Sequence, residues 1–271
     1  MRGWKAELEL SYERRGGRTV LAQRRHDGPL VVQKPLYPEG DGVCHTIVVH
    51  PPGGIAGGDD LEIRASAGPN SHVLLTTPAA GKWYRTLGPW AQQRVALTAA
   101  PGARLEWLPQ ETILFDGARA LIETCVDLAE GARFIGWDIL CLGRTAYGER
   151  YASGEFRLHT RISRAGRLVW FERARVQGGD SFCTSRAGLG GHSVCATLLA
   201  VGAVDEALVK TCRAEQARDG STGITLVQDV LVARYIGDSS ENARSYFNRL
   251  WRHIRPAVAG RAAQEPRIWN T

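Results

Sequence analysis

The sequence lacks the features of a membrane-spanning or secreted chain. None of its apolar runs approaches the roughly 18 residues that a membrane-spanning helix needs. Residues 1–17 contain no apolar segment of the secretory type, and none of the six cysteines forms a CxxC pair. We therefore expect a cytoplasmic protein without a membrane segment, a zinc ribbon or a redox motif, in which most thiols are reduced and buried.

Motifs of the common catalytic classes are also missing. GxSxG does not occur, Gly81-Lys82 lacks the neighbours of a phosphate-binding loop, and residues 188–191 lack the dinucleotide-binding pattern. The seven histidines include neither HxH nor HExxH. His45 and His50 lie five positions apart, so on one regular strand they point to opposite faces and cannot chelate together. We expect neither an enzyme of these classes nor a tight, preformed zinc site.

The charge of the chain is nearly balanced. The 34 basic and 28 acidic side chains give a net charge of +6, and they are spread along the sequence. No basic run is long enough to form a nucleic-acid-binding arm, so no nucleic-acid partner is expected. Apolar residues make up 44% of the 271, which is typical of a folded globular protein. No linker is evident, and we expect a single domain over residues 1–271.

Short strand-like segments follow one another from Val43 to Ala200, at a spacing of about ten residues and bounded by Gly, Pro, Asn or Asp. Similar corners at residues 67–70, 100–103 and 129–132 favour a mainly β fold of coiled or layered sheets. A further strand pair is expected between Ile224 and Tyr235.

Two helices are expected besides the strands. The first covers about 205–218 and begins at an aspartate cap. The second covers about 240–255, where an apolar stripe follows Ser239 and Ser240. Pro256 is expected to end this helix, because proline cannot continue its hydrogen bonding.

The most distinctive segment is HPPGGIAGGDD at residues 50–60. Proline and glycine occupy six of the eight positions 51–58, so this segment must be a loop between two strands. In the strand that follows, apolar residues alternate at 61, 63 and 65. Asp59 therefore shares the inward face, whereas Asp60 and Glu62 point outward. The loop is either a structural corner or a corner that holds carboxylates for a ligand.

Two other carboxylates lie in apolar surroundings. Asp138 occurs in the run 134–142, which is apolar on both faces. A buried, unpaired carboxylate costs several kcal/mol, so Asp138 must be paired, protonated or next to water. Arg144 is a candidate structural partner, and a polar passage through the interior is the alternative. Glu172 poses the same question. Together with the aspartate after the glycine loop, these residues favour a shared polar interior.

Five segments in order along the chain carry a family resemblance. They are HPPGGIAGGDDLEI (50–63), LLTTPAAGKWYR (74–85), LEWLPQETILFDGA (105–118), WDILCLGRTAYGE (137–149) and PRIWNT (266–271). With the helical segment at 235–256, they resemble the urease accessory protein family UreD, also called UreH. The resemblance covers nearly the whole chain, although residues 177–216 match only loosely.

The resemblance implies a mostly β fold and a role that is not enzymatic. UreD proteins are chaperones that join the urease apoprotein and bridge it to UreF, and through UreF to the nickel-carrying GTPase UreG. In that family nickel is proposed to pass through a water-filled tunnel, so Ni²⁺ would be bound transiently and no cofactor permanently. The tunnel carboxylates carried over to this chain would be Asp59 or Asp60, Asp138, Glu172 and Glu149.

A carboxylate path suits such a role, because Ni²⁺ held only by carboxylates and water is bound loosely enough to be released. Two alternatives remain open. The chain could be a metal-independent scaffold that joins UreF to urease, with Asp59 and Asp138 paired to arginines. It could also be an unrelated β-rich module that binds a ligand such as a sugar, with which its eight tryptophans are compatible.

Overall fold

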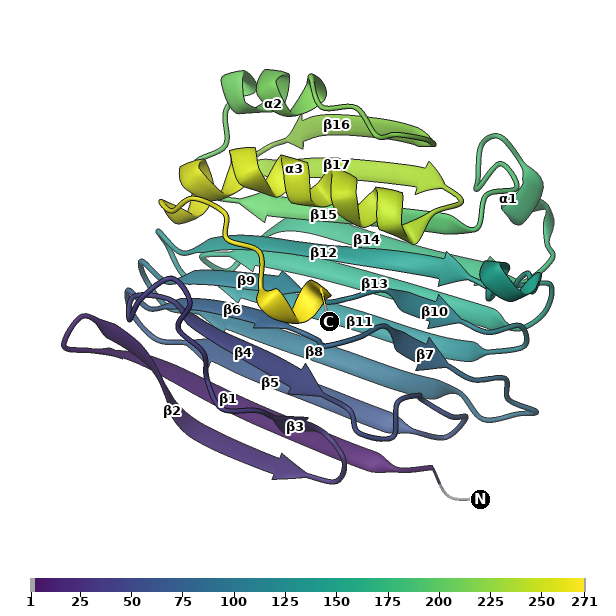
Figure 1. Ribbon diagram of the computed structural model, residues 1–271, viewed down its shortest axis with the longest axis horizontal. Coiled ribbons are helices and arrows are strands. Elements are labelled where there is room, and N and C mark those ends of the chain that lie inside the picture. Colours follow the sequence, from purple (N-terminus) through teal and green to yellow (C-terminus); the bar gives the residue numbers. More distant parts are fainter. Residues whose placement is uncertain (1–2, 271) are drawn as a thin grey trace.

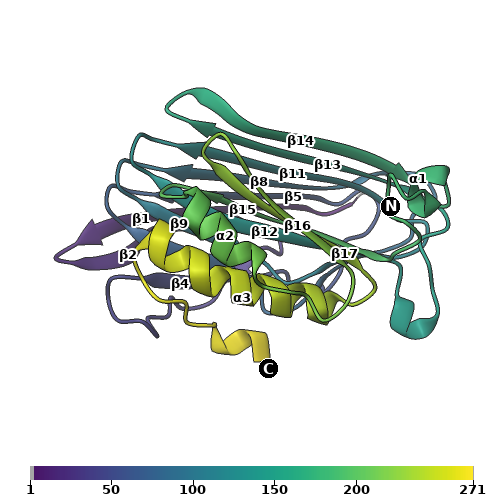
Figure 2. The same cartoon turned by 90° about the horizontal axis from the view of Figure 1, so that it is seen from above.

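The computed structural model describes residues 3–270 as two β-sheets stacked face to face, with the two longer helices on the outer side of the second sheet (Figures 1 and 2). The chain crosses from one sheet to the other and back between β4 and β13, so that successive strands coil around a common core. The turns at 67–70, 100–103 and 129–132 are three of these crossings. The mainly β, coiled architecture expected from the sequence is confirmed.

The first sheet has seven strands in the order β14-β13-β11-β8-β5-β1-β2. The pairs from β1 to β13 are parallel, and an antiparallel strand closes each edge. The strands are β1 (Lys5–Arg15), β2 (Arg18–Asp27), β5 (Asp60–Ala67), β8 (Ala91–Ala99), β11 (Arg119–Leu128), β13 (Glu155–Arg164) and β14 (Arg167–Gln177).

The second sheet has ten strands. Its main path runs β16-β17-β15-β12-β9-β6-β4-β3, and β10 joins β7 to β12. The strands are β3 (Val31–Val32), β4 (Cys44–Val49), β6 (His72–Thr76), β7 (Gly81–Trp83), β9 (Arg104–Leu108), β10 (Thr112–Leu114), β12 (Arg133–Leu142), β15 (Val194–Val201), β16 (Ser221–Val227) and β17 (Val230–Gly237).

The second sheet contributes to two apolar cores, one on each of its faces. The larger core lies between the two sheets and includes Leu97 and Val126 of the first sheet and Phe134 and Leu199 of the second. The smaller core lies between the outer face of the second sheet and the long C-terminal helix. On β12 the even-numbered residues therefore face the first sheet, and the odd-numbered residues face the helix.

The helices are α1 (Ser181–Thr184), α2 (Glu206–Arg213) and α3 (Ser240–Ala259), with 3₁₀ turns η1 (Thr145–Tyr147) and η2 (Arg267–Asn270). The expected caps are confirmed: Asp205 accepts a hydrogen bond from Leu208 N at 2.8 Å, and Ser239 accepts one from Asn242 N at 3.2 Å. The single-turn helix α1 was not expected, and α2 ends five residues before the expected position 218.

The prediction that Pro256 ends the last helix is wrong, because α3 continues to Ala259. Proline removes the hydrogen bond to the carbonyl of residue 252, but the last turn of the helix is held by contacts from outside it. The Arg133 guanidinium donates to the carbonyl oxygens of Ala257 and Val258 at 3.2 and 3.0 Å. Gly260 then closes the helix in the left-handed conformation, with its N–H on the Pro256 carbonyl.

A buried cluster of charges fastens α3 to the second sheet. Arg255, which is fully buried, donates through Nε to Glu106 at 3.0 Å and through Nη1 to Glu39 at 2.6 Å. His72 lies 2.7 Å from Glu106, and His45 lies 2.6 Å from Glu39. The cluster joins segments that are far apart in the sequence, and each buried charge in it has an opposite partner.

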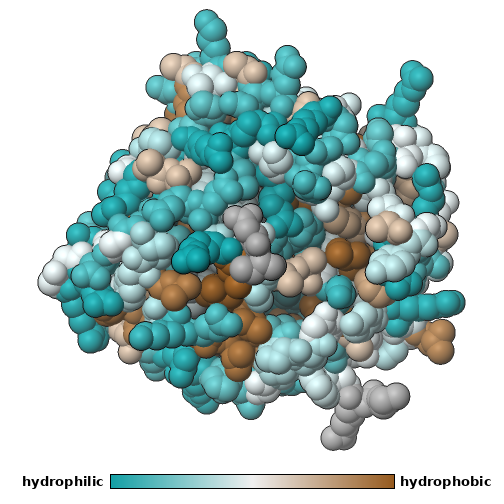
Figure 3. Space-filling model, in the orientation of Figure 1, coloured by the Kyte–Doolittle hydropathy of each residue, from teal (hydrophilic) through white to brown (hydrophobic). Residues whose placement is uncertain are grey.

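Figure 3 shows the face that carries α3, where polar residues predominate and apolar residues gather in a few limited patches. Among residues 3–270, none of the helices is long and apolar enough to cross a bilayer.

Candidate functional site

A cavity of about 420 Å³ lies between the two sheets. Its inner wall is formed by strands of both sheets, including β5, β8 and β11 of the first and β9 and β12 of the second. The exposed residues that line it are Gly53, Ala79, Gly81 and Lys82. They belong to the loop after β4 and to the segment that ends in β7, so these two segments form the mouth of the cavity.

Asp138 faces this cavity from the middle of β12. Within residues 3–270, no hydrogen bond or ion pair joins its carboxyl group to another residue. Burial, and secondly the negative charge of Glu172, raises the pKa of Asp138 to about 7. The candidate partner Arg144 binds Glu149 instead, with Nη2 and Oε2 2.5 Å apart.

Glu172 lies on β14 of the first sheet and does not line the cavity, but its negative charge acts on Asp138. Its Oε1 accepts a hydrogen bond from Arg234 Nη1 at 2.5 Å, and the same nitrogen donates to Thr197 Oγ1 at 2.8 Å. Thr197 lies opposite Asp138 in the pairing of β12 with β15, and Arg234 lies opposite Thr197 in the next strand. The structure therefore brings Asp138 and Glu172 together, one without a partner and one in an ion pair.

Asp59 is buried, with 8% of its surface exposed, so its predicted inward orientation is confirmed. Both Asp59 carboxylate oxygens accept backbone hydrogen bonds at 2.8 Å, one from Trp4 N and one from Ala56 N. Asp59 is not among the residues that line the cavity. Its observed contacts close the glycine loop and tie that loop to the N-terminal segment.

The other two candidate carboxylates lie outside the cavity. Asp60 points away from the core, as expected, and pairs with Arg94 on the outer face of the first sheet at 2.7 Å. Glu149 lies beside η1, where the hydrogen bond from Arg144 is the main cause of its lowered pKa. Neither Asp60 nor Glu149 lines the cavity that Asp138 faces.

The glycine loop is shaped by close packing. A Cβ atom at Gly54 would lie 2.2 Å from the ring of Tyr84, so only glycine fits there. The loop begins at His50, which lines the cavity, while His45 faces Glu39 on the other side of β4. The opposite orientation of these two histidines is confirmed. Among the described residues, no three His, Cys, Asp or Glu side chains are grouped as a metal site.

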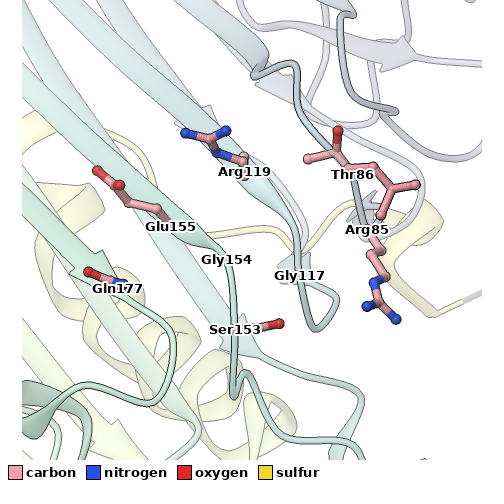
Figure 4. Close-up of a pocket in the computed structure, with 9 residues that line it drawn as sticks. Arg85, Thr86, Gly117, Arg119, Ser153, Gly154, Glu155 and Gln177 are labelled. Atoms are coloured by element: carbon pink, nitrogen blue, oxygen red, sulfur yellow. The ribbon is translucent and has the colours of Figure 1, made fainter.

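A second pocket, of about 340 Å³, lies at one end of the sheets (Figure 4). Arg119 and Glu155 lie side by side on β11 and β13, while the guanidinium of Arg85 is turned away. Two of these side chains already have partners: Arg119 donates to the Gly88 carbonyl at 2.8 Å, and Glu155 binds Arg175 at 2.6 Å. This pocket offers no unpartnered group comparable to Asp138.

Comparison with known proteins gives one consistent result. The family model for the UreD urease accessory protein matches residues 5–270. The urease accessory protein UreD of Dechloromonas aromatica (strain RCB) is 55% identical over 273 residues, which cover 99% of this chain and 95% of that relative. Those of Azoarcus sp. (strain BH72) and Pseudomonas fluorescens are 54% and 50% identical, with the same coverage. The chain belongs to the UreD family of urease accessory proteins.

The UreD-like segments of the sequence surround the cavity. The segments 50–63 and 74–85 supply its mouth, and 105–118 and 137–149 supply much of its inner wall, including Asp138. Membership of the UreD family also removes one alternative, the unrelated β-rich module that binds a ligand such as a sugar.

Proposed function

We propose that this UreD protein is a cytoplasmic chaperone that helps to load nickel into urease and is not itself an enzyme. In this proposal it binds the urease apoprotein and UreF, and through UreF the GTPase UreG. Ni²⁺ is cargo that passes through the cavity between the sheets, and no cofactor is bound permanently.

The observation that supports the proposal most strongly is the unpartnered carboxyl group of Asp138 on the cavity wall. Leaving a carboxylate without a partner costs stability, and a core has no structural reason to keep one. A divalent cation would supply the missing positive charge. Because one carboxylate with water holds Ni²⁺ loosely, the ion can leave again.

Glu172 and Arg234 fit a supporting role in this passage. Glu172 adds negative potential next to Asp138, and Arg234 balances that charge when no cation is present. We propose that Asp138 contacts the ion and that Glu172 contributes when its bond to Arg234 opens. Asp59 would shape the loop at the mouth, while Asp60 and Glu149 lie off the path.

The test is the nickel content of urease matured in cells that carry Asp138→Asn. We expect the variant to form its complex with urease in normal yield but to leave urease nickel-poor. Asp127→Asn is the matched control, because Asp127 lies on β11 with a side chain 52% exposed. Normal nickel loading by Asp138→Asn would reject the passage through this residue.

A metal-independent scaffold is the second candidate, and the contacts of Asp59 and Glu172 favour it. Both carboxylates are bound by protein groups, Asp59 through both oxygens and Glu172 through Oε1, as a structural role requires. Under the scaffold hypothesis, Asp138→Asn lowers the yield of the complex or leaves urease fully loaded. A nickel deficit in a complex of normal yield is the result that separates the two.

A further inference from the structure

The cavity between the sheets contains a second unpartnered polar group. The Nε2 atom of His50 is buried and has no hydrogen-bond partner within residues 3–270. His50 lines the same cavity as Asp138. Buried polar atoms of proteins are nearly always hydrogen-bonded, so an unbonded ring nitrogen on a cavity wall requires an explanation.

The backbone fixes the position of His50. On β4, Thr46 and Val48 face the first sheet, and His50 continues this alternation beyond the end of the strand. Pro51 restricts the backbone of His50 to an extended conformation. Gly53, at a φ of 73°, donates its N–H to the His50 carbonyl at 2.9 Å. The residue is therefore held by its main chain, with ring atom Nε2 left unbonded.

Charge at the mouth does little to attract a cation. Lys82 is exposed there, and Glu111 of the lining is neutralised by an ion pair with Arg244. The negative charge of Asp59 acts on His50, but both Asp59 oxygens are held by backbone N–H groups. The free carboxyl group of Asp138 belongs to the inner wall. Recognition of a metal ion near the mouth therefore depends on a group that coordinates it directly. Burial lowers the pKa of His50, which keeps the imidazole neutral and one ring nitrogen unprotonated.

We propose that His50 Nε2 is a nitrogen ligand that selects Ni²⁺ over Mg²⁺ and Ca²⁺ as ions enter the cavity. The inference rests on the proposed function, since it takes Ni²⁺ as the cargo of this passage. Carboxylates and water bind hard cations readily, whereas an imidazole nitrogen favours later transition metals such as Ni²⁺. One nitrogen completed by water leaves binding weak enough for transfer.

The test measures Ni²⁺ and Mg²⁺ binding to the purified full-length chain by equilibrium dialysis. We expect His50→Gln to raise the Kd for Ni²⁺ about tenfold and to leave Mg²⁺ binding unchanged. Tenfold is the smallest loss of affinity that is typical when only the hydrogen-bond partner of a metal-binding histidine is removed. His26→Gln is the matched control, because His26 is exposed on β2. X-ray absorption at the nickel edge should show imidazole scattering that His50→Gln reduces and His26→Gln preserves.

A second variant guards against a folding defect. His50→Leu removes an unbonded buried nitrogen and keeps an apolar side chain of similar size. Its thermal unfolding midpoint should be equal to or above that of the parent chain, because no hydrogen bond of Nε2 is lost. A lower midpoint for His50→Leu, or an unchanged Ni²⁺ affinity for His50→Gln, would overturn the ligand assignment.

The two proposals can fail separately. If Asp138→Asn abolishes nickel loading while His50→Gln keeps its Ni²⁺ affinity and selectivity, the passage stands and the ligand role of His50 is wrong. If His50→Gln loses selectivity while Asp138→Asn loads urease normally, His50 is a ligand on a path that avoids Asp138.

Discussion

Thr197 lies directly opposite Asp138 in the pairing of β12 with β15, yet its hydroxyl accepts a hydrogen bond from Arg234 at 2.8 Å. The same arginine neutralises Glu172. The hydroxyl and the guanidinium that follow Asp138 in the strand register are thus bonded to each other and to Glu172, and the Asp138 carboxyl lines the cavity without a partner. This arrangement is the basis of the predictions below.

The first prediction concerns stability and pH. The pKa of Asp138 is about 7 in the folded chain and 3.8 for an ordinary aspartate, so the folded state binds more protons between these values. Its stability therefore falls as pH rises through that window. The difference of about three pH units limits the effect to about 4 kcal/mol.

Asp138→Asn never ionises, so it should unfold at higher urea concentration than the parent chain at pH 8 and at a similar one at pH 4. Urea titrations at the two pH values measure this, with Asp127→Asn as the control. A variant that is less stable than the parent at pH 8 would mean that Asp138 has a structural partner.

The second prediction concerns the coupling of Asp138 to Glu172. The charge of Glu172 helps to raise the pKa of Asp138, so Glu172→Gln should lower that pKa below about 7. Carboxyl ¹³C NMR titration measures it. Glu123→Gln, on the outer face of the first sheet beside His159, is expected to leave it unchanged. Equal titration of Asp138 in both variants would show that the two carboxylates do not interact.

The third prediction concerns the buried charge cluster. Arg255→Ala leaves Glu39 and Glu106 buried without their shared cation, which should cost about 3–5 kcal/mol of unfolding free energy. Arg252→Ala, on the same helix with a side chain 61% exposed, should change it by less than about 0.5 kcal/mol. Chemical denaturation compares the two, and similar losses would contradict the assigned role of the cluster.

The fourth prediction concerns Asp59. Asp59→Ala removes the acceptor of the Trp4 and Ala56 backbone N–H groups and should cost about 1–3 kcal/mol, as measured by urea unfolding. Ni²⁺ binding by the folded variant should fall only slightly, because the parent side chain does not line the cavity and acts on His50 through its charge. Unchanged stability combined with lost Ni²⁺ binding would return Asp59 to the nickel path.

Local sequence patterns predict much of this fold because each pattern has a local cause. Alternation and Gly or Pro corners locate the strands from β4 to β15, except the short β7, and the inward face of Asp59. The hairpin β1–β2 was missed, although Ala6, Leu8 and Leu10 alternate before the turn at 16–17. Its strands are highly charged on their outer side, which hides the alternation.

The site could be predicted only in part. Asp138 and Glu172 are recognisable as carboxylates in apolar surroundings, but their partners depend on distant strands. Arg234 is 62 positions from Glu172, whereas the candidate Arg144, six positions from Asp138, is held by Glu149. The unbonded nitrogen of His50 could not be predicted from the sequence. It depends on the absence of a hydrogen-bonding group opposite His50 in the folded structure.

The most direct test of nickel loading compares urease from cells with and without this gene, with the other accessory proteins present in both. The measured quantities are nickel per urease active site and urease activity. The account predicts nickel-poor, inactive urease when the gene is absent, with recovery when it is restored. Fully loaded, active urease in its absence would contradict the maturation role.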